Sequence, residues 1–560
     1  MNTAGHRSSP DPIIPGTRWG STAVVPKTET AIGYTALLRD LGVKGYTPVH
    51  QTVLTAAATR RGRPSSDDAL GRTTAVLGGA TAAPRTTITD HLFSAIRYDG
   101  VDLEALRLAF NTLDPKELTE EIRAAPQAIP ARRAWYLYET ITGKTLDVAS
   151  DSRSKYVPLF DPERYVTCEH ARSTRHGVIV NGLGDVGRLC ATIRRSAAWE
   201  AAVAEHPLQA RDRLAAELDA TAEERINTFL ATRESHSTYE IEGESTTPKD
   251  DQLFYALLKE FTAVDQPPIS HEVLHHLQKT LLAGSVGKQV GKYRTHQIWV
   301  GDRVGDRAVP HHIAPKAEDV PSYMDAFCAV AAQLTSASRV SRSGAEDTGR
   351  DIPVLDPIAT AAVTSGLLAY LHPFDDGNGR VGRLLLQRPL TSHDVGRRLF
   401  VPISAAIARK KNAYYDSLDA WSKPLLNRIT YDQHQGGVTV TNDTRDLYRY
   451  PDITRYAGFI AEACTEAVNK DLLDERRTLA VYDAVNPLLL KAGLDEKKAQ
   501  LYFKLAYQNG GRLGKRKTRF FPTLAEGDLT SLANAIARAA KQEGLTLPKR
   551  HEPVPESSAP

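Results

Sequence analysis

The 560-residue chain has little of several features that define whole classes of protein. Its four cysteines, Cys168, Cys190, Cys328 and Cys464, are far apart and form no CxxC pair, so we expect neither a disulfide framework nor a zinc site. Lys plus Arg number 70 against 67 for Asp plus Glu, and a net charge of +3 gives no global case for a nucleic-acid partner. No run approaches 18 apolar residues and the N-terminus lacks the apolar segment of a signal peptide, so we expect a cytoplasmic protein without a membrane partner.

Helical patterns dominate the chain after residue 90, where apolar residues recur at three- and four-residue spacing, so the predicted class is mainly α. The length suggests several domains. We predict a partly disordered N-terminal region (1–89), a helical N-terminal domain (90–194), a central core (195–450), a helical C-terminal domain that could be winged-helix-like (451–547) and a disordered tail (548–560).

The core is expected to contain helices over 195–235, 249–263, 270–282 and 356–371, and a hairpin over 297–315. In DPIATAAVTSGLLAYL, Asp356 is a good N-cap and Pro357 suits the first helical position. Because this helix is apolar nearly all round, we expect it to be central and buried.

The stretch HPFDDGNGR, residues 372–380, separates this helix from a second helical run, VGRLLLQRPL. Gly377 and Gly379 allow the backbone to turn its N–H groups inward, and Asn378 can add a side-chain donor. The loop leads into a helix N-terminus, which attracts anions. Such a loop predicts a phosphate-binding site.

Charged residues beside this loop indicate the chemistry. Arg380 and Arg383 are three apart and share a helix face, and two arginines at an anion site favour a polyphosphate. Asp376 next to phosphates suggests a bridging Mg²⁺. His372 is suited to accept a proton near neutral pH. These residues predict phosphoryl or nucleotidyl transfer, and the alternative is a capped turn between two core helices.

The stretch from His372 through Arg383 matches the motif HPFx[D/E]GNGRxxR without gaps, and here the chain resembles the Fic domain family. The resemblance implies a Fic-type helical bundle core with a β-hairpin flap and helical flanking domains, in an enzyme that transfers AMP from ATP to a Ser, Thr or Tyr hydroxyl of a protein. The implied roles are the general base for His372, Mg²⁺ binding for Asp376, an anion hole of Gly377, Asn378, Gly379 and Arg380, a grip on the γ-phosphate for Arg383 and a core anchor for Phe374.

A second pattern lies upstream, in STYEIEGE, residues 237–244. On its own it is a surface helical turn closed by Gly243. Thr238, Glu242 and Gly243 also match [S/T]xxxE[G/N], the inhibitory helix of many Fic proteins. The resemblance implies that Glu242 pairs with Arg383 and repels the ATP phosphates, which predicts an autoinhibited enzyme.

The predicted hairpin resembles the flap of the same family, which pairs with an extended target segment. We assign target docking to Val300, Gly301, His312 and Ile313, with a plain surface hairpin as the alternative. The adjacent His311 and His312 point to opposite faces of a strand, so they do not form a metal pair.

The segment ISAAIARKKNAYYDSL, residues 403–418, resembles the family's helix after the motif. There Tyr414 or Tyr415 lines the adenine pocket or packs in the core.

Two other signals are ambiguous. VIVNGLGDVGR has the spacing GxGxxG, but a dinucleotide site needs a second strand and the residues that follow are predicted to be helical. GRLGKRKTRF, residues 511–520, suggests DNA binding, although the sequence reveals no recognition helix before it and a solvated or protein-docking face is favoured. Its basic residues are Arg512, Lys515, Arg516, Lys517 and Arg519.

The predicted function is an autoinhibited protein adenylyltransferase whose partners are ATP, Mg²⁺ and a target protein, and self-modification also fits. The main alternative is a Fic enzyme that uses another nucleotide donor or removes AMP from its target. A third reading is a nucleotide-sensing regulator that binds DNA.

Overall fold

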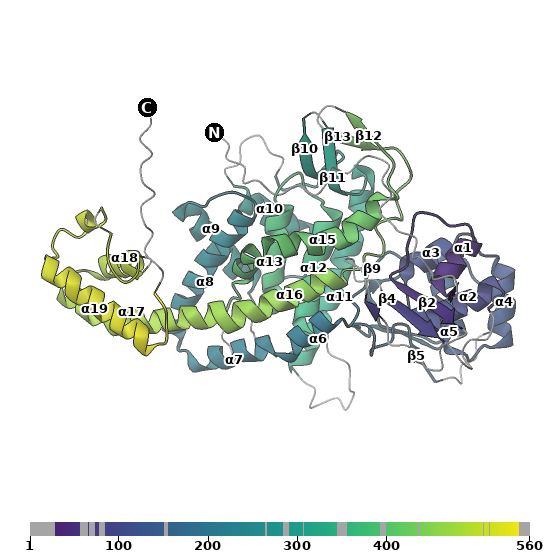
Figure 1. Ribbon diagram of the computed structural model, residues 1–560, viewed down its shortest axis with the longest axis horizontal. Helices are drawn as coiled ribbons and strands as arrows, with labels where there is room; N and C mark the ends of the chain where they lie inside the picture. The colour runs from purple at the N-terminus through teal and green to yellow at the C-terminus, as the bar shows by residue number, and fades with distance from the viewer. Residues whose placement is uncertain are drawn as a thin grey trace. The chain divides into compact units, whose positions relative to one another are not determined.

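The structure, a computed structural model, describes residues 29–55, 65–66, 73–77, 85–149, 155–263, 266–283, 290–305, 307–343, 355–391, 399–434, 437–507, 509–514 and 516–547 (Figure 1). The chain divides into two compact units. One comprises Met1–Ala204, Ala256–Leu390 and Lys410–Glu462, and the other Glu205–Tyr255, Thr391–Arg409 and Ala463–Pro560. These units differ from the predicted domains, because two segments that we placed in the core group with the C-terminal part.

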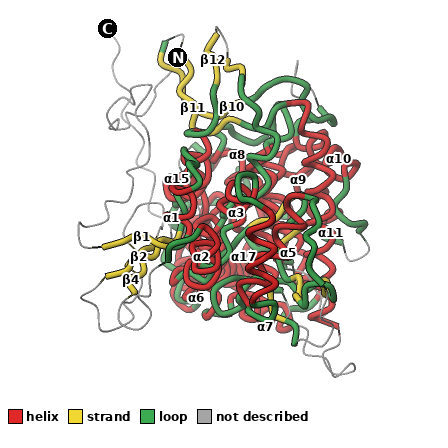
Figure 2. Tube along the Cα trace, turned by 90° about the vertical axis from the view of Figure 1, so that its right-hand side faces the viewer, coloured by secondary structure: helices red, strands yellow, loops and turns green. Residues whose placement is uncertain are grey.

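The protein is mainly helical, as predicted, with short strands between the helices (Figure 2). The helices that lie in the first unit, or begin there, are α1 (Tyr34–Asp40), α2 (Ile88–Ser94), α3 (Leu103–Phe110), α4 (Pro115–Ala124), α5 (Ile129–Thr142), α6 (Ala197–Ala204), α10 (His271–Leu281), α11 (Val320–Ser343), α12 (Pro357–Leu371), α13 (Asn378–Leu390), α15 (Lys411–Leu426) and α16 (Thr454–Glu466). The others are α7 (Pro207–Glu217), α8 (Ala220–Ile241), α9 (Pro248–Phe261), α14 (Ile403–Arg409), α17 (Leu473–Lys491), α18 (Glu496–Tyr507) and α19 (Glu526–Gln542).

The described strands all belong to the first unit. A mixed sheet has the order β1-β2-β4-β3, and β5-β7-β6, β8-β9, β10-β11 and β12-β13 form smaller sheets. Their bounds are β1 (Glu29–Ile32), β2 (His50–Thr55), β3 (Ser65–Ser66), β4 (Thr73–Leu77), β5 (Val157–Pro158), β6 (Ala171–Ser173), β7 (Val178–Val180), β8 (Leu183–Asp185), β9 (Leu189–Ala191), β10 (Trp299–Val304), β11 (Arg307–Ile313), β12 (Tyr431–His434) and β13 (Gly437–Val440).

The first described residues share a hydrophobic core with the helices that follow them. Tyr34 and Leu37 of α1 belong to the same buried cluster as Leu106 of α3 and Trp135 of α5. The predicted boundary at residue 89 therefore does not separate two cores. The predicted disorder of residues 1 to about 30 and of the tail 548–560 lies outside the described residues, except for the start of β1 at Glu29.

The glycine-rich stretch VIVNGLGDVGR contains strands β7 and β8 and the turn that leads to β9. After β7, strand β8 pairs antiparallel with β9 through Leu183↔Ala191 and Gly184↔Cys190. The prediction that the following residues are helical holds only from α6, which starts at Ala197. Strand β9 comes first, and a three-residue strand leaves almost no periodic signal. An antiparallel hairpin lacks the βαβ unit of a dinucleotide site.

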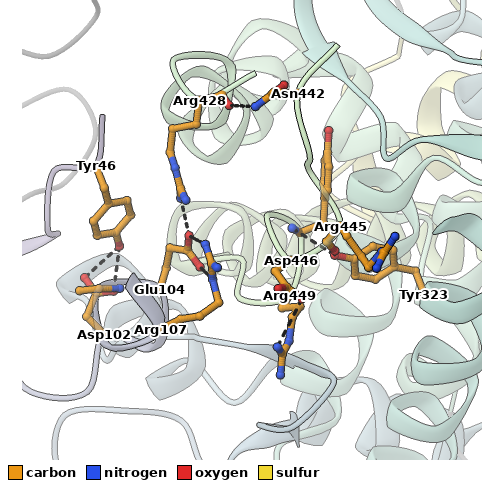
Figure 3. A network of polar contacts seen from close by, with 12 residues as sticks. Tyr46, Asp102, Glu104, Arg107, Tyr323, Arg428, Asn442, Arg445, Asp446 and Arg449 are labelled. Carbon is orange, nitrogen blue, oxygen red and sulfur yellow. Dashed lines mark hydrogen bonds and ion pairs between the residues drawn. The ribbon is translucent and has the colours of Figure 1, made fainter. Parts of the chain in front are cut away.

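A polar network joins the N-terminal helices to the segment that follows α15 (Figure 3). Glu104 of α3 accepts hydrogen bonds from Arg107 and from Arg428, and the carbonyl of Arg428 accepts from Asn442 at 2.8 Å. Farther along, the hydroxyl of Tyr448 donates to the carbonyl of Ile313 at 2.6 Å. This second contact joins the segment after β13 to the end of strand β11.

The fold bears on the predicted winged-helix character of the C-terminal domain and on the expected lack of a membrane span. In the described part of residues 451–547 there are helices and no strands, so the structure provides no wing for a winged-helix domain there. None of the helices in the described ranges is long and apolar enough to cross a membrane. The cytoplasmic location stays a prediction.

Buried Asp99 makes the stability of the N-terminal core depend on pH. Its carboxylate accepts a hydrogen bond from Tyr34 N at 3.0 Å and another from Thr52 Oγ1, and burial raises its pKa to about 7. The Asp99 carboxylate lies directly against the backbone of Gly33, which has φ +67°. A Cβ added to Gly33 would lie only 2.0 Å from Asp99 Oδ2. The protonated carboxyl therefore favours the folded state, a contribution complete below about pH 4 and lost as the pH rises toward 7.

We predict that the difference in unfolding free energy between the wild type and Asp99→Asn falls as the pH rises from about 4 to about 7, because the amide does not titrate. Urea unfolding at intervals over this range measures it. Asp147→Asn is the control, since that side chain is 98% exposed. A constant difference for Asp99→Asn would contradict the assignment.

Candidate functional site

Helix α12 delivers His372 to the start of the motif loop. As predicted, Asp356 caps the helix through Ile358 N at 2.8 Å, Pro357 begins it, and nearly every residue is buried. The helix ends where His372 takes the left-handed conformation, with φ 47° and ψ 59°. A residue other than glycine is uncommon in that conformation, and such residues concentrate at functional sites.

One contact fixes which ring nitrogen of His372 can accept a proton. His372 Nδ1 lies 3.3 Å from the carbonyl oxygen of Ala369, one turn earlier in α12. Because a carbonyl only accepts, Nδ1 carries the hydrogen in this contact. Nε2 is then the nitrogen with a lone pair, as a general base requires.

Buried Arg294 holds the backbone on which His372 sits. Its guanidinium donates to three carbonyl oxygens, those of His372 at 2.9 Å, His296 at 2.9 Å and Pro315 at 2.5 Å. The backbone N–H of Arg294 donates to the carbonyl oxygen of Pro373 at 2.9 Å. Burial lowers the pKa of Arg294 to about 10, so it stays charged near neutral pH. This arginine joins the motif to both ends of the hairpin.

Asn378 braces the motif loop with its side chain. Its Oδ1 accepts from Phe374 N at 2.9 Å and its Nδ2 donates to Phe374 O at 2.8 Å. Phe374 itself is fully buried. One of the two Asn378 amide hydrogens is thus used within the loop, and donation of the other to phosphate stays a prediction.

The glycine turn between the two helices places an acid beside an arginine. Gly377 has φ +84°, and its N–H donates to Asp376 Oδ1 at 2.7 Å. Asp376 Oδ2 lies 3.6 Å from Arg380 Nη2, and the Asp376 side chain is 30% exposed. From α10, buried Gln278 donates to the Asp376 carbonyl at 3.1 Å. Gly379 follows in the first turn of α13.

Helix α13 presents two buried arginines. Arg380 and Arg383 are 4% and 2% exposed. Arg383 lies near enough to Tyr456 for its charge to lower the pKa of that phenol, against the larger raising effect of burial. Buried cations next to a glycine turn and a helix start form a strongly anion-attracting environment.

His312 lies behind His372, with 6.5 Å between the ring centroids. Its Nε2 donates to the carbonyl of Tyr370 at 2.8 Å, and its Nδ1 lies 3.3 Å from the hydroxyl of Ser422. Burial and then the nearby His372 lower the pKa of His312 to about 3, so it is neutral at physiological pH. His312 therefore supports the end of α12 without adding charge.

The predicted hairpin is confirmed, and only part of it faces outward. Val300 is 43% exposed, and the register shifts between Val300 and Gly301. His312 and Ile313 are buried. Assigning these two side chains to target docking is therefore corrected, because the core uses them, and the assignment of Val300 and Gly301 stays a prediction.

The two tyrosines of α15 differ in their surroundings. Tyr414 is buried, with its ring 6.2 Å from that of Tyr456 and 5.8 Å from that of Phe459. Core packing is thus its observed role. Tyr415 is half-buried with Lys411 Nζ 5.7 Å from its ring centroid, and its place in an adenine pocket stays a prediction.

The predicted inhibitory pattern ends helix α8, in the second unit. Thr238 is buried in the last turn, Glu242 is the C-cap and Gly243 has φ +78°. Earlier in the helix, buried Glu234 accepts from Ser404 N at 2.8 Å and from Ser404 Oγ at 2.6 Å. The helix is thus held against α14, while the pairing of Glu242 with Arg383 stays a prediction.

A single carboxylate suits the implied metal. Mg²⁺ in nucleotide sites is commonly bound by one or two carboxylates together with substrate phosphates. Asp376 is partly exposed and next to the anion-attracting start of α13, so the residues present fit Mg²⁺ that arrives with a nucleotide. The described residues contain no cluster of three or more His, Cys, Asp or Glu that could hold a metal by itself.

Comparison with known proteins agrees with this geometry. Residues 268–390 match the family described as Fic/DOC family. The chain contains a Fic/DOC family domain. This Fic domain extends from just before α10 to the end of α13, and so includes the flap, Arg294 and the whole motif.

Several individual proteins are similar to the chain. The curated relative "Protein adenylyltransferase Fic" of Nematostella vectensis is 31% identical over 131 residues, which is 23% of each of the two proteins. Solved structures include a Fic family protein from Desulfovibrio desulfuricans G20, at 18% identity over 54% of this chain and 86% of that one, with a TM-score of 0.33. Fic-1 from C. elegans is 15% identical over 71% and 96%, with a TM-score of 0.30.

Asn378→Ala tests the bracing role of that side chain. The substitution leaves Phe374 N and O buried without partners, so we predict a loss of about 3 kcal/mol in unfolding free energy without any nucleotide. Thermal and urea unfolding measure it.

Asn442→Ala is the matched control, because Asn442 also accepts from one backbone N–H (Thr430) and donates to one carbonyl (Arg428) but is only half-buried. Asn442→Ala should lower the unfolding free energy by less than Asn378→Ala does. Unchanged stability of Asn378→Ala together with weaker ATP binding would show a phosphate-donor role instead.

Proposed function

We propose that this protein transfers AMP from ATP to a Ser, Thr or Tyr hydroxyl of a protein. The observation that supports this most is the order of groups in the Fic motif: a histidine at the end of α12, a glycine turn with an acid, and buried Arg380 and Arg383 at the start of α13. The name of the Nematostella vectensis relative agrees with this activity. The matched region spans under a quarter of that relative's length.

The proposed step is an attack of the target hydroxyl on the α-phosphorus of ATP. A new P–O bond forms to the hydroxyl oxygen, the bond to the β-phosphate oxygen breaks and pyrophosphate leaves. His372 Nε2 takes the hydroxyl proton. Mg²⁺, held at Asp376, would supply positive charge to the α- and β-phosphates.

Backbone and guanidinium groups of the motif would bind the phosphates. The backbone N–H groups at the start of α13, including those of Asn378 and Gly379, would bind phosphate oxygens, and the second hydrogen of the Asn378 amide would add a side-chain donor. Arg380 adds charge to this anion hole, and Arg383 binds the γ-phosphate. Preorganised donors of this kind stabilise the charge that develops in the transition state.

The flap would hold the target by strand addition. Strand β10 pairs with β11 on one side, and Val300–Val304 are exposed. Backbone groups along the other side of β10 suit an extended segment. We therefore place the target hydroxyl beside His372 with its chain along β10; the chain itself can also serve as the target.

Regulation would come from Glu242. Thr238 anchors the last turn of α8 and Gly243 ends it, so Glu242 has a defined place at the helix end. In the proposed inhibited state its carboxylate pairs with Arg383 and removes that arginine from the γ-phosphate. The enzyme becomes active when the carboxylate leaves.

A Fic enzyme with another donor, or one that removes AMP, would use the same histidine and arginines. The first alternative is tested by asking whether GTP, UTP or CTP competes with labelled ATP. The second is tested by asking whether pre-modified protein loses its label.

For autoinhibition we predict that Glu242→Gly raises protein labelling from α-labelled ATP and Mg²⁺ at least tenfold, because Arg383 becomes available to the γ-phosphate. Glu244→Gly, two residues farther on, is the matched control and should label like the wild type. Adding His372→Ala to Glu242→Gly should lower labelling about 10²- to 10⁴-fold, as expected for loss of a general base. Equal labelling by Glu242→Gly and the wild type would contradict the inhibitory role.

A further inference from the structure

One segment of the second unit has a charge unlike the rest of the chain. Residues 497–525 contain eight Lys or Arg and no Asp or Glu. The other 531 residues have 62 basic and 67 acidic side chains, so they are net acidic. The segment comprises α18 without its first residue, Glu496, and the residues up to α19. Repulsion within such a run is unfavourable unless the fold or a partner offsets it.

The fold gives this segment a firm support. Helices α17, α18 and α19 share their own hydrophobic core, with Val485 and Leu489 packed in the same cluster as Tyr502 and Ile536. These three helices are drawn in yellow-green and yellow tones in Figure 1. The basic residues therefore lie on an ordered module.

A short turn connects α17 to α18. Gly493, with φ +86°, lets the chain reverse after α17, and its N–H donates to Leu490 O at 3.0 Å. Asp495 then caps α18 by accepting from Lys498 N at 2.8 Å. A helix, a four-residue turn with glycine and a second helix is the arrangement in which many DNA-binding proteins present a recognition helix.

Helix α18 has one buried face and one exposed polar face. Ala499, Tyr502, Phe503 and Ala506 are buried. The exposed side chains at spacing i, i+3, i+4 and i+7 are Lys497, Gln500, Leu501 and Lys504. The structure thus reveals the outward polar helix face that the sequence did not.

The cations of this face have no acidic partners. Among the described residues, none of Lys497, Lys498, Lys504, Arg512, Arg516, Lys517 and Arg519 forms an ion pair, and all of these are exposed. On α17, by contrast, Arg476 lies 3.3 Å from Glu217 and Arg477 lies 3.6 Å from Asp474. Arg519 lies over the ring of Phe520, which is 50% exposed.

We propose that α18 and the basic segment after it bind double-stranded DNA. The lysines and arginines would contact phosphates, which gives most of the affinity. An α-helix fits the major groove, where a glutamine side chain reads adenine and an apolar one contacts the thymine methyl group. Gln500 and Leu501, between Lys497 and Lys504, are placed for that reading.

The proposal rests on a different unit from the Fic site, so either can fail without the other. The test measures binding of the full chain to a fluorescein-labelled 30-base-pair duplex of random sequence by anisotropy at several salt concentrations. We expect log K to fall linearly with log salt.

Lys497→Ala/Lys504→Ala removes two phosphate contacts. It should reduce the magnitude of the salt slope by about 1.8 and weaken binding about 60-fold at 0.1 M salt. Lys497→Gln/Lys504→Gln should change the slope and the affinity as much as the double alanine variant does, because both variants remove the same two charges. The matched control is Arg476→Ala/Arg477→Ala, which removes two paired arginines of the same module and should leave the slope unchanged. Circular dichroism checks that all variants are folded.

Three results would overturn the proposal. The first is that the full chain does not bind the duplex at 50 mM salt, or binds it with an affinity that does not change with salt concentration. Another is binding of poly-glutamate as tight as that of duplex at equal charge, which would indicate an acidic protein partner. The third is binding of single-stranded DNA alone, since that would exclude a helix in the major groove.

Discussion

The buried guanidinium of Arg294 is the interaction on which the arrangement of the Fic site depends. It donates to carbonyl oxygens of His372, His296 and Pro315, and so connects the motif loop to both ends of the hairpin. Water cannot replace a donor set with this geometry in the interior, because each freed carbonyl would be left buried without a partner. The left-handed backbone of His372 is maintained by such contacts, and with it the place of the proposed base.

Around Arg294, uncharged side chains add further support to the motif loop. His312 and Gln278 bind carbonyl groups next to the motif, and the Asn378 side chain closes the loop onto Phe374. None of these groups brings a charge, because burial keeps the pKa of His312 at about 3. Buried Arg380 and Arg383 follow the glycine turn in the first turns of α13, and their charges attract anions.

The sequence was sufficient for those parts of the site that are contiguous. The cap at Asp356, the buried helix α12, the hairpin and the glycine turn all follow from local patterns. Arg294 lies 78 residues before His372, and no local rule indicates that its side chain turns inward. The bracing role of Asn378 was missed, because a sequence does not show that a side chain bonds the backbone of its own loop. Short strands such as β8 and β9 were not predicted, because three residues show no periodicity. The exposed face of α18 could be recognised only once the structure showed which of its residues pack against α17 and α19.

The central claim is that the motif transfers the adenylyl group and not the terminal phosphate. It can be tested by incubating Glu242→Gly protein and acceptor proteins with Mg²⁺ and ATP labelled either at the α- or at the γ-phosphorus. Attack at the α-phosphorus with Arg383 on the γ-phosphate predicts that protein is labelled from α-labelled ATP and not from γ-labelled ATP. Label from γ-labelled ATP alone would contradict the account and indicate a phosphoryl transferase.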